Sequence, residues 1–294
     1  MPVPASNHGP ITALKPSDEQ VLRSLHRFHY LSSRQLCRLA YSRGSLTYAQ
    51  SKLKKLTDAG YCQRIWVPKR AQYGSAPSVY ALARRGINHL RAIGLDLNGR
   101  FHPSEKRSLS YLFLNHVLEL NDVLISAELL SRAMPQYRLA ALRHDQDLKR
   151  TPVAVRTKSG GKAAVIPDAW LDLRIQERFQ VCLAVELDRG TEEQKRWRQK
   201  VANLIAYAGG PYQEAFGTHS LTFAVITTAG DKRLLDLLRW TEAELESMGE
   251  TSQGDLFLFT SLSPAAAESI EIFLARCWLQ PFSQEPVALL ESPD

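Results

Sequence analysis

The sequence predicts an α/β protein, α+β overall, built from two modules of opposite charge. Three stretches with apolar residues at helical spacing, followed by two short strands, occupy the first third of the chain. A strand, a short turn, a second strand and a long helix follow one another between residues 163 and 208. The net charge of +7 divides into +13 on residues 1–107 and −6 on residues 108–294. We therefore expect a basic module joined to a mildly acidic one.

The basic module, at residues 17–95, is predicted to be a winged helix-turn-helix domain, preceded by a flexible tail at residues 1–16. Each of its first three helices begins at a Ser or Thr whose side chain can cap the N-terminus. The expected helix starts are Ser17, Ser32 or Ser33, and Ser45 or Thr47. Strands are expected at residues 61–67 and 78–82, and a fourth helix at 83–93. Three helices followed by a two-stranded wing are typical of this DNA-binding fold.

The third helix is the expected DNA-reading element of this module, because it would enter the major groove. Its outer face carries Thr47, Tyr48, Gln50, Ser51, Lys52, Lys54 and Lys55. The uncharged side chains suit base edges and the lysines suit phosphates. In the loop between the strands, Lys69 and Arg70 suit phosphate or minor-groove contacts. A solvated basic face, or a winged helix that contacts protein, is the alternative, but the charge and the fold together favour double-stranded DNA.

The acidic module contains two apolar strands that are expected to form a hairpin. Residues 163–175 and 179–187 are separated by the polar segment Gln176-Glu177-Arg178. A turn centred on Glu177 pairs residues whose numbers sum to 354, which places Asp168 opposite Glu186. Asp172 and Asp188 then lie on the same face, since side chains alternate along a strand.

Asp168 and Glu186 are therefore candidate metal ligands. Two carboxylates this close repel each other unless a cation lies between them or one is protonated. Mg²⁺ and Mn²⁺ prefer such oxygen ligands. The alternative is that these acids are solvated strand ends, or are paired with Arg174, Arg189 or Lys200.

The segment Ile166-Pro167-Asp168, the hairpin, and Val185-Glu186-Leu187-Asp188 together resemble the core of the PD-(D/E)XK nucleases. The resemblance implies that Asp168 and Glu186 hold the metal and that a lysine two residues after the Glu orients the attacking water. Asp188 stands at that lysine position here, so Lys200, or Lys195, on the next helix is the candidate replacement. The implied catalytic set is Asp168, Glu186, Asp188 and Lys200.

The longer string from Glu186 to Thr191, followed by a helix with Lys200 and Tyr207, resembles the bacterial replication-relaxation family over residues 17–262. This family joins a winged helix to a nuclease-like domain. The resemblance implies a restriction-endonuclease-like mixed-sheet domain at residues 111–280. The polar residues 96–110 before it are expected to be a linker, and residues 281–294 a flexible tail.

Two functions follow from this resemblance. The first is a DNA-binding protein of plasmid or mobile-element replication or transfer that is also a Mg²⁺- or Mn²⁺-dependent DNA endonuclease. The second is a non-catalytic DNA-binding accessory or regulatory protein with a degenerate nuclease fold. A relaxase or replication protein, and a second copy of the chain, are candidate partners.

Composition excludes several other classes. The four cysteines, at positions 37, 62, 182 and 277, are dispersed, which argues against a zinc site or a disulfide framework and fits a reducing cytosol. The first 16 residues lack the charged start and apolar core of a signal peptide. No apolar run approaches the roughly 20 residues of a membrane span. The expected location is the cytoplasm, without a membrane partner.

Overall fold

The computed structural model describes residues 13–66, 78–97, 109–157 and 160–291. The chain divides into two compact units, Met1–Ile125 and Ser126–Asp294, called here the first and the second unit. The division falls inside helix α5 (Tyr111–Ala133), which the sequence analysis placed wholly in the second domain.

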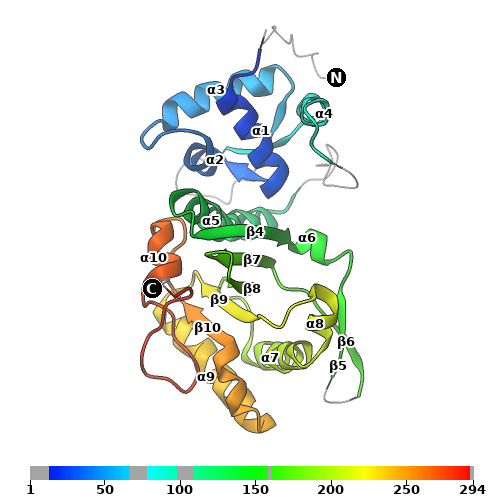
Figure 1. Ribbon diagram of the computed structural model, residues 1–294, viewed down its shortest axis with the longest axis vertical. Coiled ribbons are helices and arrows are strands. Elements are labelled where there is room, and N and C mark those ends of the chain that lie inside the picture. Colours follow the sequence, from blue (N-terminus) through cyan, green and yellow to red (C-terminus); the bar gives the residue numbers. More distant parts are fainter. Residues whose placement is uncertain (1–12, 67–77, 98–108, 158–159, 292–294) are drawn as a thin grey trace. The chain divides into compact units, whose positions relative to one another are not determined.

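The first unit combines helices with a small antiparallel sheet (Figure 1). Its helices are α1 (Pro16–Phe28), α2 (Ser33–Ala40), α3 (Leu46–Asp58), α4 (Arg84–Ala92) and the first part of α5. Its described strands are β1 (Leu31–Ser32), β2 (Cys62–Ile65) and β3 (Val79–Leu82), in the order β1-β3-β2. Helices α1 to α4 and strands β2 and β3 follow the order expected from the sequence, whereas β1 was not expected. Residues 67–77, which include Lys69 and Arg70, lie outside the described residues.

Local capping explains where the first two helices begin. Ser32 Oγ accepts a hydrogen bond from the Gln35 amide at 3.2 Å, and Gln35 Oε1 accepts one from the Ser32 amide at 3.0 Å. This reciprocal pair confirms Ser32 as the cap of α2. Helix α1 begins before the expected Ser17, because Pro16 suits a first helical position and the Asp18 carboxylate accepts the Lys15 amide at 3.0 Å.

The first part of α5 is an integral part of the first unit. Leu114, Val117 and Leu118 share a buried apolar cluster with Tyr30 and Val79. The Asn121 side-chain amide donates to the carbonyl oxygens of Phe28 and Tyr30, at 3.0 and 2.7 Å. These two carbonyls flank the left-handed residue at the end of α1, so Asn121 stabilises the turn between α1 and β1.

The second unit is built around a five-stranded mixed sheet in the order β10-β9-β8-β7-β4 (Figure 1). The strands are β4 (Tyr137–His144), β7 (Ala169–Ile175), β8 (Phe179–Asp188), β9 (Thr222–Thr227) and β10 (Phe257–Thr260). Strand β7 pairs antiparallel with both β4 and β8, whereas β9 is parallel to β8 and to β10. The predicted mixed sheet is confirmed.

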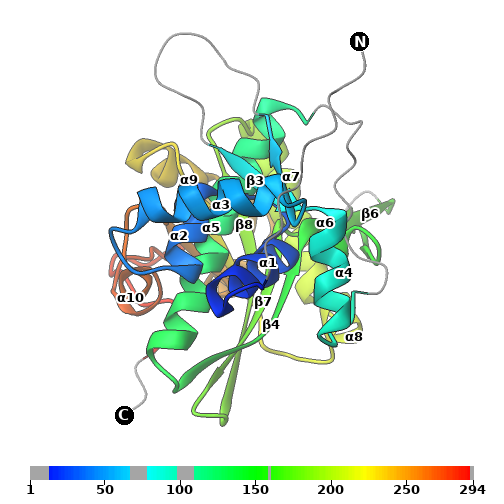
Figure 2. The ribbon, with the colours of Figure 1, turned by 90° about the horizontal axis from the view of Figure 1, so that it is seen from above.

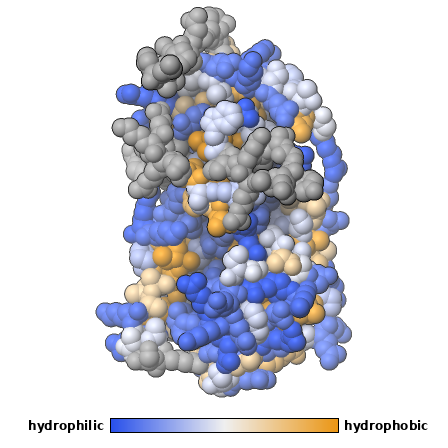
Figure 3. Space-filling model, turned by 180° about the vertical axis from the view of Figure 1, so that it is seen from behind, coloured by the Kyte–Doolittle hydropathy of each residue, from blue (hydrophilic) through white to orange (hydrophobic). Residues whose placement is uncertain are grey.

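Helices α7 (Gln194–Ala208) and α9 (Asp231–Met248) bury the apolar side chains of one sheet face. Trp197, Val201 and Leu204 from α7 share a core cluster with Phe223 and Val225 of β9. Helix α7 begins at Gln194 with Glu193 as its N-cap. The short helix α8 (Pro211–Phe216) and the 3-10 turn η1 (Thr251–Leu256) complete this part of the unit. On the face shown in Figure 3, the surface of the second unit is mostly hydrophilic, with apolar side chains in separate patches.

The segment between β4 and β7 forms a short helix and a separate hairpin. It contains α6 (Asp145–Leu148) and a two-stranded hairpin, β5 (Val153–Arg156) and β6 (Lys162–Val165). The hairpin extends away from the five-stranded sheet in both Figure 1 and Figure 2.

The C-terminal segment contains helix α10 (Ser269–Leu274), after which Trp278 and Leu279 form bridges with Val287 and Phe259. Residues 281–291, expected as part of a flexible tail, continue this packing. Leu289 and Leu290 are buried, because removing their apolar side chains from water is favourable. This packing depends on the tertiary structure, and the periodicity of the sequence does not predict it.

Candidate functional site

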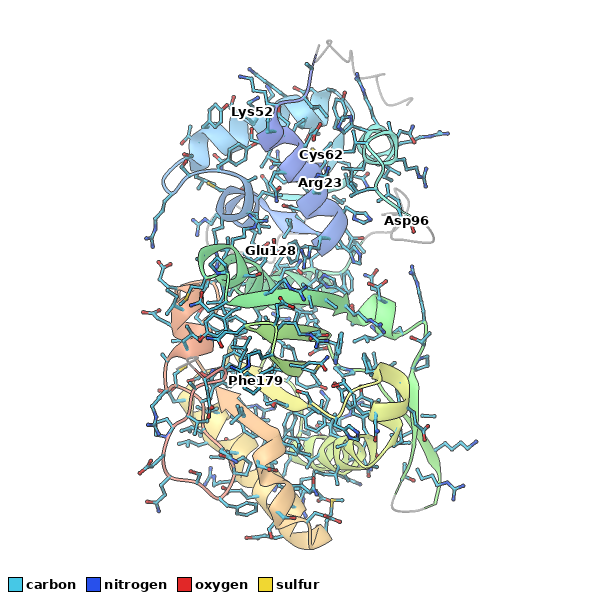
Figure 4. The ribbon with its side chains drawn as sticks, viewed as in Figure 1. Arg23, Lys52, Cys62, Asp96, Glu128 and Phe179 are labelled. Carbon is cyan, nitrogen blue, oxygen red and sulfur yellow. The ribbon has the colours of Figure 1, made fainter. Side chains whose placement is uncertain are left out.

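The β7–β8 hairpin has the register that the sequence predicts. Paired residues run from Ala169 with Val185 to Ile175 with Phe179, so their numbers sum to 354. The turn residues Gln176 and Glu177 have φ values of 51° and 55°, which match the right-handed twist of a tight hairpin. The exposed ring of Phe179, labelled in Figure 4, marks the turn end of β8. The other end of the hairpin is therefore the end that carries Asp168 and Glu186.

Asp168 lies directly before β7 and is held against β8. Its amide donates to the Val185 carbonyl at 3.0 Å, and its Oδ2 accepts from the Leu187 amide at 2.8 Å. These two bonds position its carboxylate beside Glu186, the residue between the two partners. The side chain is half-buried, so it is accessible to a ligand.

Glu186 forms the centre of the site. The residue is 2% exposed, and its Oε2 lies 2.8 Å from Lys200 Nζ on α7. Lys200 Nζ also lies 3.6 Å from a carboxylate oxygen of Glu192. The sequence-predicted residues Asp168, Glu186 and Lys200 are thus brought together, with Lys200 contributed by the helix that follows the hairpin.

The charges in this site are strongly coupled. Burial, the largest effect, and the nearby Asp168 carboxylate raise the pKa of Glu186, while Lys200 lowers it, and the net result is a pKa of about 7. Burial would lower the pKa of Lys200, but the carboxylates of Glu186, Glu192 and Asp168 raise it above its ordinary value. Lys200 is therefore a fixed cation, whereas Glu186 titrates near neutrality.

Tyr207, about two helical turns after Lys200 on the same face of α7, adds a buried polar atom to this region. Its side chain is fully buried, and its hydroxyl has no hydrogen-bond partner within the part of the chain that the structure describes. Burial raises its pKa, and the Glu186 charge raises it further. A buried hydroxyl without a partner is costly, and it fits a site that takes up a polar ligand.

Asp188 has a different role from the other three predicted catalytic residues. Both of its carboxylate oxygens accept hydrogen bonds from the Arg233 guanidinium, at 2.8 and 2.9 Å. The Thr227 hydroxyl and the Gly190 amide donate to the same carboxylate, each at 2.9 Å. Asp188 therefore joins the end of β8 to the first turn of α9. The sequence analysis missed Arg233, since no spacing rule links positions so far apart.

Asp168 and Glu186 carry the carboxylate oxygens that a Mg²⁺ or Mn²⁺ ion would take as ligands. Among residues 13–66, 78–97, 109–157 and 160–291, no group of three or more His, Cys, Asp or Glu side chains is arranged to hold a metal. Mg²⁺, however, usually takes only one or two carboxylates from a protein and completes its shell with water and substrate phosphate. Asp168 and Glu186 would be those two ligands.

The outer face of α3 in the first unit keeps most of its predicted residues exposed. Thr47, Tyr48, Gln50, Ser51, Lys54 and Lys55 all face solvent. Lys52, labelled in Figure 4, differs because its Nζ lies 3.3 Å from the buried carboxylate of Asp18 on α1. Lys52 is thus engaged within the unit, whereas Lys54 and Lys55 are accessible.

Trp66, which follows β2, is a further exposed residue that the sequence analysis did not single out. It is 80% exposed, and the Arg64 guanidinium lies 5.0 Å from its ring centroid. The sequence signal for this residue was a single Trp at the end of a strand with alternating polarity. Trp side chains are usually mostly buried, so an exposed one is a candidate contact residue.

The two units define an α/β protein with a carboxylate–lysine site on a mixed sheet and an exposed basic helix face. The chain belongs to the replication-relaxation family, whose model matches residues 22–222, and the resemblance seen in the sequence is confirmed. The matched region includes Asp168, Glu186 and Lys200. No curated protein and no solved structure is significantly similar to the chain. In the described ranges, no helix is both long enough and apolar enough to cross a membrane.

Proposed function

We propose that the protein binds double-stranded DNA in plasmid or mobile-element replication or transfer, and that its second unit is a Mg²⁺- or Mn²⁺-dependent DNA endonuclease. The observation that carries this proposal is the meeting of Asp168, Glu186 and Lys200 at one end of the β7–β8 hairpin. The family description, replication-relaxation, supports a setting in which DNA is the substrate.

The first unit is proposed to be a winged helix that docks on duplex DNA. Three helices are followed by the antiparallel pair β2 and β3, as in that fold. In this arrangement α3 enters the major groove, where Tyr48, Gln50 and Ser51 contact base edges. Lys54 and Lys55 contact phosphates, and Lys69 and Arg70 would extend these contacts from the loop between the strands.

The second unit is proposed to have the PD-(D/E)XK nuclease core. Asp168 and Glu186 would hold the metal ion, which supplies Lewis acidity and an activated water when bound. Lys200 takes the place of the lysine that the motif expects at position 188. Its ammonium group, fixed 2.8 Å from Glu186, orients the attacking water and stabilises negative charge that develops on the phosphate.

A plasmid-nicking assay tests the proposed hydrolysis. Supercoiled DNA is incubated with the full chain and Mg²⁺ or Mn²⁺, and the fraction of nicked product is measured over time. Removing a group that stabilises the transition state typically costs about 10²–10³ in rate, so Asp168→Asn, Glu186→Gln and Lys200→Met should lose most activity. Wild-type protein that produces no nicks with either metal ends the endonuclease proposal.

Asp172→Asn is the matched control for these variants. Asp172 lies on the same face of β7 as Asp168, but its carboxylate is already bonded to Arg174 and Gln180, at 3.1 and 3.0 Å. This variant removes one negative charge from the same hairpin without touching the site. It should therefore keep the wild-type nicking rate.

A non-catalytic DNA-binding role is the second candidate, and one observation favours it. Lys200 already neutralises the buried Glu186 carboxylate, so the site is electrostatically satisfied without a metal. Titration calorimetry with Mn²⁺ distinguishes the two functions. Site-specific DNA binding without cleavage and without Mn²⁺ binding would support the accessory role. Co-purification and sedimentation test the further proposed partners, a relaxase or replication protein and a second copy of the chain.

A further inference from the structure

The β5–β6 hairpin of the second unit has an unusual concentration of positive charge. Residues 149–166 contain five Lys or Arg side chains and no Asp or Glu, although residues 108–294 as a whole carry a net charge of −6. Two of the five, Lys149 and Arg150, form ion pairs with Asp145 and Asp147 of α6, at 2.6 and 3.4 Å. The remaining charge therefore belongs to the hairpin strands and their connection.

Arg156 and Lys162 lie directly opposite each other in the antiparallel pairing of β5 and β6. Both are exposed, and no ion pair joins either of them to an acidic residue of the described chain. Directly opposed side chains have Cβ atoms only about 4.5–5.5 Å apart, so two like charges destabilise the pair. This arrangement therefore contributes no stability to the folded unit, whereas a bound polyanion would neutralise both charges at once.

The opposite face of the hairpin fixes it to the unit. Val155 and Val165 are buried in the same apolar cluster as Trp197 and Val201 of α7. Because side chains alternate along each strand, burial of these two valines directs Arg156 and Lys162 outward. Arg156 and Lys162 are thus exposed on a hairpin whose other face is packed against the core of the second unit.

The hairpin also leads directly into the candidate site. Strand β6 ends at Val165, and Asp168 follows after Ile166 and Pro167. At about 3.3 Å per residue, the six steps from Lys162 to Asp168 span at most about 20 Å. The β5–β6 hairpin can therefore contact a DNA strand whose phosphodiester lies at Asp168. The major groove of DNA is also wide enough to admit a two-stranded hairpin of this kind.

We propose that the β5–β6 hairpin is a DNA-backbone contact of the second unit, in which Arg156 and Lys162 each neutralise one phosphate. This inference rests on the proposed DNA function and adds a contact that is independent of α3. The second unit would then have its own DNA-binding contact, close in the chain to the residues that would cleave the DNA.

The salt dependence of DNA affinity tests this contact in the full chain. Binding to a labelled 30-base-pair duplex of arbitrary sequence is measured between about 50 and 200 mM salt, the range in which phosphate contacts dominate affinity. The slope of log K against log salt is negative, and each lost phosphate contact reduces its magnitude by about 0.9, so Arg156→Ala/Lys162→Ala should reduce the magnitude by about 1.8. Arg156→Lys/Lys162→Arg should restore the wild-type slope.

Arg239→Ala/Arg276→Ala is the matched control, because it removes the same net charge from exposed positions of the same unit. Each of these arginines already has a carboxylate partner, Asp236 and Glu285 respectively. Its slope should equal that of the wild type. The melting temperature of the Arg156→Ala/Lys162→Ala variant should not fall, since the substitution relieves a repulsion between exposed side chains.

Four outcomes decide the inference. A smaller magnitude of the slope for Arg156→Ala/Lys162→Ala, but not for Arg239→Ala/Arg276→Ala, supports the inference. An unchanged slope in a protein that binds the duplex overturns the hairpin contact and leaves the proposed DNA function intact. If that variant instead loses affinity only for polyglutamate, the hairpin docks an acidic protein and the inference is wrong. Wild-type protein that fails to bind the duplex overturns both the inference and the proposed function.

Discussion

Removal of the Arg233 guanidinium should destabilise the second unit by about 3–5 kcal/mol, the usual cost of leaving a buried charge without its partner. The Asp188 side chain is 2% exposed and that of Arg233 is 13% exposed, so water screens this pair poorly. In Arg233→Ala, the Asp188 carboxylate keeps only the Thr227 hydroxyl and the Gly190 amide as donors. For a unit of this size, the loss corresponds to a fall in melting temperature of roughly 6–20 °C.

Urea unfolding followed by tryptophan fluorescence measures this loss, because Trp170, Trp197 and Trp278 are buried in the second unit. Arg239→Ala, which removes an exposed arginine from the same helix, should change the unfolding free energy by less than about 0.5 kcal/mol. Replacing both partners, as Asp188→Leu/Arg233→Met, should recover much of the stability. If Arg233→Ala unfolds within about 1 kcal/mol of the wild type, Asp188 is not a structural anchor and its assignment must be revised.

The same pair predicts a dependence of stability on pH. Burial would raise the pKa of Asp188, but hydrogen bonds from Arg233, Gly190 and Thr227 outweigh burial and hold the pKa below its usual range. Stability contributed by a carboxylate with a lowered pKa is present above the unfolded-state value of about 3.9 and is lost as the pH falls through the folded-state pKa. The stability difference between the wild type and Asp188→Asn should therefore be constant from about pH 7 to 5 and shrink below about pH 4. A difference that grows on acidification would contradict this sign.

Three further substitutions test individual contacts. Asn121→Ala should cost the first unit about 1–3 kcal/mol in urea unfolding, because the carbonyls of Phe28 and Tyr30 both lose the hydrogen bond from this amide; a loss below about 0.5 kcal/mol would refute the role of the amide. Lys52→Met should lower the melting temperature more than Lys54→Met does, since it leaves the buried Asp18 without this partner. Lys54→Met should weaken DNA binding more than Lys52→Met does. Equal effects of the two variants on both measurements would remove the distinction between the two lysines. Tyr207→Phe removes a hydroxyl without a described partner, so the unfolding free energy should stay the same or rise by up to about 1 kcal/mol. A clear fall would mean that a ligand or water engages this hydroxyl.

Several features of the protein were determined by the sequence alone because they depend on local geometry. The apolar strands on either side of Gln176-Glu177-Arg178 fixed the hairpin register, and with it the approach of Asp168 to Glu186. Helical periodicity likewise placed Lys200 and Tyr207 on one face of α7. The start of α2 was also limited to Ser32 or Ser33 by the sequence, since a cap acts within one helical turn, and the structure selects Ser32.

The partners of the charged side chains were decided only by the tertiary structure. Asp188 occupies a position where the nuclease motif has a lysine, and only the packing of α9 against the sheet brings Arg233 to it. Lys52 was expected on the DNA-facing surface, but the neighbouring helix α1 presents a buried Asp18 to it. Periodicity and capping act over a few residues, whereas the energy of a buried charge depends on which distant group the folded chain brings within about 3 Å of it. The sequence therefore determined which carboxylates would gather, and the folded chain decided which of them remain available for a ligand.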